Sequence, residues 1–181
     1  MKRLAPYTIM DDIKRFLTPV LFLVSLMFLF FTVGCGKTKY QREVNALNKT
    51  YDAKIYVYGE NIDFKYRLQY EMTSDISSLE NDIEYSFVIL NVVKDDVNSV
   101  FISEVKELEN QGFTIIYLNF LDYYSKIKDS GIDIIGNENE LNYNNLYLIN
   151  YKTKISIIDN GQDGWAIVNN MFDYITAVRE S

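Results

Sequence analysis

Two apolar runs on either side of an amphipathic segment constrain the fold of this chain more than any other feature. Residues 85–93 (YSFVILNVV) and 113–120 (FTIIYLNF) are almost continuously apolar, which is typical of parallel strands buried on both faces. Residues 95–111 between them predict a helix that ends at Gly112. Its predicted apolar face consists of Val97, Val100, Phe101, Val105 and Leu108. The pattern predicts a β-α-β unit with a right-handed crossover.

The remaining pattern extends this unit into a single domain over residues 51–181. Residues 53–58 alternate as a strand does, and two short strands at 146–151 and 154–158 predict a hairpin at the sheet edge. Further helices are predicted over residues 63–72, 121–130 and 165–178. Strands that alternate with helices predict an α/β three-layer sandwich with a mostly parallel sheet and an antiparallel edge hairpin.

An uncharged apolar run, residues 16–33, precedes this domain. As a helix it would be roughly 27 Å long, close to the thickness of a bilayer core. The hydrophobic part of a secretory signal is usually shorter, about 7–15 residues. Length alone therefore leaves a cleaved signal and a retained N-terminal hydrophobic helix both open.

The run ends in Thr32-Val33-Gly34-Cys35, which resembles the lipobox of bacterial lipoprotein signal peptides, although that family favours Leu where Thr32 stands. The resemblance implies that Cys35 receives a diacylglyceryl group and, after cleavage, becomes the first residue. Residues 1–34 would then be the signal peptide, and acyl chains such as palmitate would hold the protein on the extracytoplasmic face of the cell membrane. The alternative is a single-pass protein that keeps the run as a signal anchor.

Residues 35–50 are polar and predict a linker. Within them, Gly36-Lys37-Thr38 matches the end of a P-loop, but Phe31 stands where the motif needs its first Gly. No dinucleotide fingerprint follows the first strand either. We therefore expect no nucleotide cofactor.

Composition excludes several kinds of chemistry. The chain has no His, and Cys35 is its one Cys, so His-based triads and His/Cys zinc sites are impossible. The first 34 residues carry four basic and two acidic side chains, which leaves a charge of −9 on the remainder. A domain that acidic repels nucleic acid, so no nucleic-acid partner is expected.

Acidic residues follow several predicted strands. Asp95, Asp96 and Asp159 are expected at the carboxyl edge of the sheet, where ligands bind, and carboxylates suit Mg²⁺ or Ca²⁺. This allows a membrane-tethered, metal-dependent hydrolase or transferase. The competing interpretation is that Asp95, Asp96 and Asp163 cap helices. Residues 159–164 resemble a calcium loop but lack its bidentate Glu. We assign no metal ligand and no catalytic residue.

The order of elements looks like that of flavodoxin-like and class I glutamine amidotransferase-like domains, carried by residues 85–93 and 113–120. The amidotransferase nucleophile and its His are absent, so the resemblance implies a non-catalytic binding module. An aromatic binding face is an alternative use of five early tyrosines, which are otherwise expected in strands and core: Tyr51, Tyr56, Tyr58, Tyr66 and Tyr70. The sequence therefore predicts a lipid-anchored interaction module whose protein or small-ligand partner is unknown.

Overall fold

The structure is a computed structural model that describes residues 39–81, 84–122, 124–131, 146–150, 155–159, 161 and 163–180, together with Pro19. The chain divides into two compact units, residues 1–39 and residues 40–181, and the second unit contains the folded domain. Apart from Pro19, the apolar run lies outside the described residues, as do Cys35 and the segment 132–145. No helix within the described residues is long and apolar enough to cross a membrane.

Six strands form one sheet in the order β2-β1-β3-β4-β5-β6. The strands are β1 (Lys54–Gly59), β2 (Glu71–Thr73), β3 (Ser86–Asn91), β4 (Thr114–Tyr117), β5 (Leu146–Asn150) and β6 (Ile155–Asp159). The first four strands of this order are parallel to one another, whereas β5 is antiparallel to both β4 and β6. The predicted mostly parallel sheet with an antiparallel edge hairpin is confirmed.

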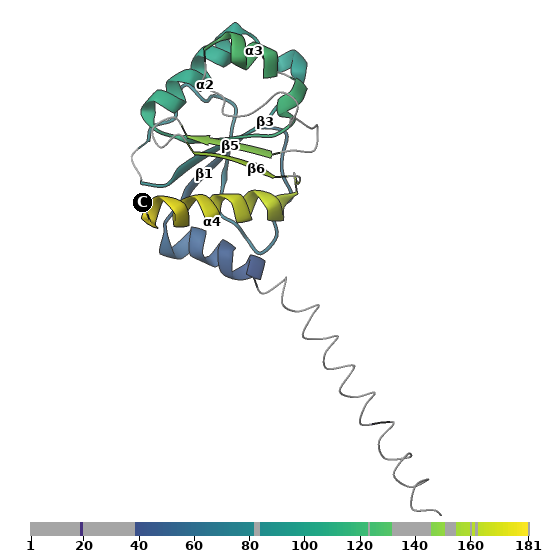
Figure 1. Ribbon diagram of the computed structural model, residues 1–181, viewed down its shortest axis with the longest axis vertical. Coiled ribbons are helices and arrows are strands. Elements are labelled where there is room, and N and C mark those ends of the chain that lie inside the picture. Colours follow the sequence, from purple (N-terminus) through teal and green to yellow (C-terminus); the bar gives the residue numbers. More distant parts are fainter. Residues whose placement is uncertain are drawn as a thin grey trace, which may run out of the picture. The chain divides into compact units, whose positions relative to one another are not determined.

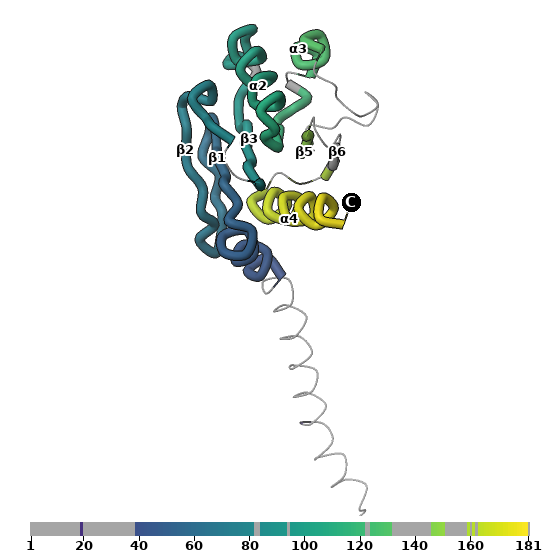
Figure 2. Tube along the Cα trace, turned by 90° about the vertical axis from the view of Figure 1, so that its left-hand side faces the viewer, coloured from purple at the N-terminus to yellow at the C-terminus, as the bar shows by residue number. Residues whose placement is uncertain are grey.

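Helices cover both faces of the sheet, so the domain has three layers (Figures 1 and 2). Helix 39–50 and α4 (Gly164–Glu180) pack on one face, in a core that includes Ile55 and Val57 of β1. The helices α2 (Ser99–Gln111) and α3 (Tyr124–Asp129) pack on the other. The strands β1, β3, β4 and β5 therefore divide their apolar side chains between two separate cores, as the period of two along a strand requires.

The central strand β3 is buried on both faces. Phe87 and Ile89 belong to the core under α4, whereas Val88 and Leu90 belong to the core under α2. All four side chains have 0% exposure. Complete burial of one such side chain is worth about 1.5–3 kcal/mol, so β3 needs both helical layers for its stability.

Helix 39–50 belongs to the folded domain, so the predicted linker over residues 35–50 is wrong in its second part. Tyr40, Val44 and Leu47 recur at helical spacing, and all three are buried in the core under α4. The last turn, η1 (Ala46–Thr50), is π-helical. The amide of Ala53 donates to the carbonyl of Leu47 at 2.9 Å and ties the helix end to the start of β1. The compact unit begins at residue 40 rather than 51.

The helix predicted over residues 63–72 is absent. Phe64 and Leu68 do face one core, as their spacing of four predicted, but a turn rather than a helix brings them there. Tyr66 and Arg67 have left-handed φ angles of 61° and 56°, which a right-handed helix cannot contain. Met72 lies on the edge strand β2 and is 45% exposed.

The amphipathic segment of the β-α-β unit forms α2 as predicted, with two differences. Gly112, at a φ of 91°, ends the helix. The cap at its start is Asn98, whose Oδ1 accepts from the amides of Val100 and Phe101, so the prediction of Asp95 or Asp96 as the cap is wrong. Val100, predicted on the apolar face, is 64% exposed.

Substitution of Leu47 by Ala tests whether helix 39–50 is part of the domain. Because Leu47 is fully buried, we expect L47A to lower the free energy of unfolding by about 2–5 kcal/mol. The exposed Asn45 is the matched control in the same helix, and N45A should change it by less than about 0.5 kcal/mol. Denaturant unfolding of the full chain gives both values. If both variants lose an equally small part of the free energy of unfolding, the result would contradict a buried helix and support the linker predicted from the sequence.

Candidate functional site

The carboxyl edge of the parallel strands is the place where this topology predicts a site. The chain leaves β1 toward β2 and leaves β3 toward β4, so the strand order reverses between β1 and β3. Ligands of open α/β sheets bind in the crevice at such a switch point. Gly59, Asn91 and Asn119 follow or end the three strands that meet there.

Hydrogen bonds of the domain itself close this switch point. The amide of Glu60 donates to the carbonyl of Asn91 at 2.9 Å, and Asn91 Nδ2 donates back to the carbonyl of Glu60 at 3.0 Å. Asn119 Nδ2 donates to Asn91 Oδ1 at 3.3 Å. A Cβ on Gly59 would lie 2.1 Å from the carbonyl oxygen of Asn91, so only glycine permits this approach. The amides at this edge bind one another rather than forming an open cradle.

The structure does not gather the predicted acidic residues into a metal site. No group of three acidic side chains within the described residues is placed so that it could hold a metal ion. Asp95 and Asp96 lie in the exposed short helix η2 (Lys94–Asp96), and Asp159 Oδ2 accepts from Asn170 Nδ2 at 2.9 Å. Asp163 Oδ1 accepts from the amide of Ala166 at 2.8 Å, which confirms the predicted cap of the last helix.

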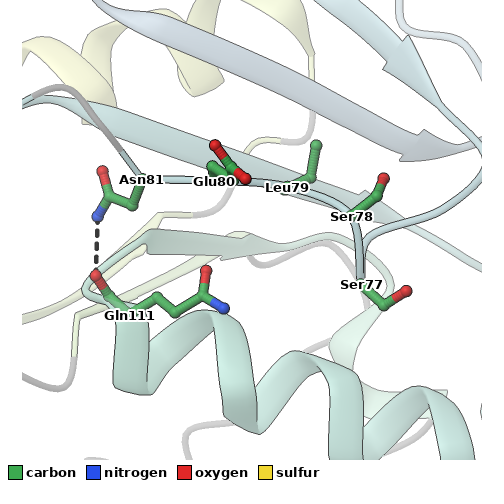
Figure 3. Close-up of a pocket in the computed structure, with 6 residues that line it drawn as sticks. All are labelled: Ser77, Ser78, Leu79, Glu80, Asn81 and Gln111. Carbon is green, nitrogen blue, oxygen red and sulfur yellow. Dashed lines mark hydrogen bonds between the residues drawn. The ribbon is translucent and has the colours of Figure 1, made fainter.

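A polar groove lies between residues 75–81 and α2, on the face of the sheet opposite helix 39–50. Figure 3 shows six residues that line one part of it. One hollow of about 500 Å³ adjoins a second of about 230 Å³, and the two share Ser77 and Gln111. We call both together the α2 groove. Its polar lining residues are Ser77, Ser78, Glu80, Asn81, Ser103, Glu104, Glu107 and Gln111.

Local hydrogen bonds fix the wall of the α2 groove formed by residues 75–81. Asp75 Oδ1 accepts from both the amide and the hydroxyl of Ser77, at 3.0 and 2.6 Å. These bonds hold the pKa of the Asp75 carboxyl below its ordinary value, so it is ionised at neutral pH. At the far end of the segment, Asn81 Nδ2 donates to the carbonyl of Gln111 at 3.0 Å (Figure 3). Buried Ile76 and Leu79 anchor the segment in the core under α2.

The α2 groove is negatively charged. Glu80 and Glu107 are exposed, and Glu104 is half-buried. Of these three acids, Glu104 affects Tyr58, which stacks on Phe101 with ring centroids 5.7 Å apart. Burial, followed by the charges of Glu104, Asp96 and Asp75, raises the pKa of the Tyr58 phenol. A surface with this charge and many hydroxyl and amide groups suits a cationic ligand that carries several hydrogen-bond donors.

Beneath α2 lies a buried carboxyl group, Glu109, although the amphipathic pattern of the helix predicts a polar, solvent-facing position for it. Its side chain is 3% exposed, and its Oε1 accepts from the Tyr117 hydroxyl at 2.9 Å. Burial raises the pKa of Glu109, against the smaller lowering effects of the Tyr117 hydrogen bond and of Lys106. Glu109 lines neither hollow of the α2 groove. Its raised pKa therefore affects the stability of the fold rather than the groove.

The Glu109→Gln variant tests this buried carboxyl group. Below the ordinary pKa of 4.5, the Glu109 carboxyl is protonated in both the folded and the unfolded state, and its contribution to stability is fully present. As the pH rises from 4.5 through the higher pKa of the folded state, the unfolded state loses its proton first, and this contribution to stability is lost. Glutamine keeps an oxygen for Tyr117 and carries no proton to lose. We therefore expect E109Q to unfold at a higher temperature than the parent, by a margin that grows from acidic to neutral pH. A margin that is constant with pH would contradict a raised pKa.

The early tyrosines do not form one binding face. Tyr56 is buried in the core under α2, whereas Tyr51 packs against Tyr85 and Phe172 on the other side of the sheet. Tyr66 meets Tyr40 edge to face, and Tyr70 meets Phe64. Packing explains their positions, as the core interpretation predicted.

Comparisons with known proteins add no relative: no family model, curated protein or solved structure matches the chain. The α2 groove was not predicted from the sequence. Asn81 and Gln111, which close one end of it, are 30 positions apart and belong to no recognisable motif. The one sequence feature that agrees with the negative charge of the groove is the acidic net charge of the chain.

Proposed function

We propose that the chain is a membrane-anchored lipoprotein of the extracytoplasmic face, tethered through Cys35, and that it is a binding module. The observation that carries this proposal is the position of Cys35. It ends the apolar run, and the first core residue, Tyr40, follows only five positions later. Five residues reach at most about 18 Å. An acyl group on Cys35 would therefore hold the folded domain directly at the membrane surface.

The α2 groove is the surface that we assign to binding. It lies on the face covered by α2, whereas helix 39–50, which leads from the tether, packs on the opposite face of the sheet. A domain held by its first helix thus keeps the groove accessible to the surrounding solution. The charge of the groove favours a basic segment of a partner protein as its ligand.

Retention of residues 16–33 as a signal anchor is the second candidate, favoured by the 18 uncharged residues of the run. In this form too, only a few residues separate the apolar run from Tyr40. The metal-dependent hydrolase is not proposed, because Asp95, Asp96 and Asp159 belong to no group that could hold a metal ion. The strand order β2-β1-β3-β4 supports the flavodoxin-like resemblance at the level of fold.

The Cys35→Ser variant tests the tether. We expect the membrane-extracted protein to begin at an acylated Cys35 and to incorporate labelled palmitate, and C35S to keep residues 1–34 and take up no label. Intact mass and labelling are the measurements. Thr38→Ser, just outside the lipobox, is the control and should label normally. An unmodified mature protein that begins at Met1 would favour the signal anchor instead.

Binding of oligolysine to the full chain in lipid nanodiscs tests the groove. The double variant Glu104→Gln/Glu107→Gln should weaken binding about 2- to 30-fold, because an exposed charge contributes roughly 0.2–1 kcal/mol. Asp173→Asn/Glu180→Gln removes the same charge from the exposed side of α4 and is the matched control. Equal losses in both double variants would show that only net charge matters and would contradict a groove-specific site. Oligoglutamate should not bind.

A further inference from the structure

The connection between β1 and β2 carries a basic turn that lies against helix 39–50 and contacts both its first turn and its last turn. Lys65, Tyr66 and Arg67 are all exposed at its tip. The first turn of the helix within the folded unit adds exposed Arg42. Because residues 35–181 carry a net charge of −9, this is a local concentration of positive charge, and it lies near residue 40, where the folded unit begins. We call Arg42, Lys65, Tyr66 and Arg67 the 65–67 surface.

The turn is held in an unfavourable conformation by contacts from the helix. Tyr66 and Arg67 both occupy the left-handed region, which residues with a Cβ avoid. Asn48 holds the chain on one side, because its Nδ2 donates to the carbonyl of Arg67 and its Oδ1 accepts from the amide of Gln69, both at 3.0 Å. On the other side, the amide of Lys65 donates to the Tyr40 hydroxyl at 3.3 Å. The structure thus maintains a backbone that presents two long side chains to solvent.

Aromatic side chains accompany the charges. Tyr66 is 36% exposed, and its ring meets that of Tyr40 at 5.2 Å. The one Trp of the chain, Trp165, is 46% exposed. Trp165 follows Gly164. A Cβ added to Gly164 would lie 2.8 Å from the carbonyl oxygen of Asp63 and 3.3 Å from the Phe64 ring. Trp165 therefore lies beside the start of the connection between β1 and β2. Tyr and Trp prefer the headgroup region of a bilayer, and Lys and Arg bind anionic lipids there.

We propose that the 65–67 surface, together with Trp165, docks onto anionic lipid headgroups of the membrane to which the chain is tethered. This inference rests on the membrane tether of the proposed function, in its acylated or its spanning form. Either form brings the first helical turn within a few residues of the bilayer. Asp63 and Asp163 border the surface and limit its charge, so docking requires the high local concentration that the tether provides. Docking would fix the orientation of the domain and turn the α2 groove away from the lipid.

Fluorescence of Trp165 tests the inference without any label. The full chain is reconstituted into vesicles of phosphatidylcholine alone, or of equal parts phosphatidylcholine and phosphatidylglycerol, with brominated acyl chains that quench tryptophan on contact. We expect strong quenching in the anionic vesicles and weak quenching in the neutral ones. Lys65→Glu/Arg67→Glu should lower the docked population by about tenfold or more. The milder Lys65→Gln/Arg67→Gln serves if the charge reversal disturbs folding, which circular dichroism reports.

The matched control reverses two charges on the other face of the sheet, in Lys106→Glu/Lys128→Glu on α2 and α3. It should be quenched like the parent. Quenching that is unchanged in the 65–67 variants, or lost equally in the control, would overturn the inference. Vesicle flotation of the same samples reports the tether separately. A chain that floats with unquenched Trp165 contradicts the docking surface alone, whereas a chain that fails to float contradicts the tether and the docking together.

Discussion

Burial of β3 on both of its faces is the interaction on which the rest of this domain depends. Its side chains alternate between two cores, and neither core can close without helices on that side of the sheet. One helical layer consists of α2 and α3, which precede and follow β4 in the middle of the domain sequence. The other comes from the two ends of the domain, helix 39–50 and α4. Residues 40–50 are therefore part of the core and cannot serve as a flexible spacer.

The burial of this segment has a functional consequence. A chain tethered at Cys35 has only residues 36–39 between its anchor and its first core residue. In the proposed tethered form, this short connection holds the domain at the membrane. The orientation of the domain then depends on which side chains of its first helix and of the neighbouring turn contact the lipid. The 65–67 surface lies on that side, and the α2 groove lies on the face covered by α2. In the proposed function, the side of the sheet with helix 39–50 faces the membrane and the side with α2 binds the partner.

Sequence patterning predicted the parts of the fold in which periodicity and burial agree. The continuous run of β3 and β4, the stripe of α2 ending at Gly112, and the edge hairpin β5–β6 are of this kind. It failed at residues 63–72, where Asn48, some 20 positions away, holds a turn that brings Phe64 and Leu68 into the core without a helix. It also failed at residues 39–50, because three apolar residues among polar neighbours resemble a linker until their tertiary partners are known.

The candidate site was less predictable than the fold. Topology correctly predicts that β1, β3 and β4 end at one edge, but it does not reveal that Asn91 and Asn119 fill that edge with their own hydrogen bonds. The acidic residues predicted there cap a helix, bind Asn170 or lie exposed. The α2 groove arises from an association between residues 75–81 and the end of α2, which only the folded chain brings together.

Hydrogen exchange of the amides of Val44 and Leu47, measured on the full chain in membranes, tests the central claim most directly. If helix 39–50 completes the core and leaves only a short connection, both amides should be protected to the same degree as those in the middle of α4, because they open only when the domain unfolds. Exchange as fast as that of an unstructured segment would contradict the claim. The domain would then begin after residue 50, and residues 35–50 would be a long, flexible linker.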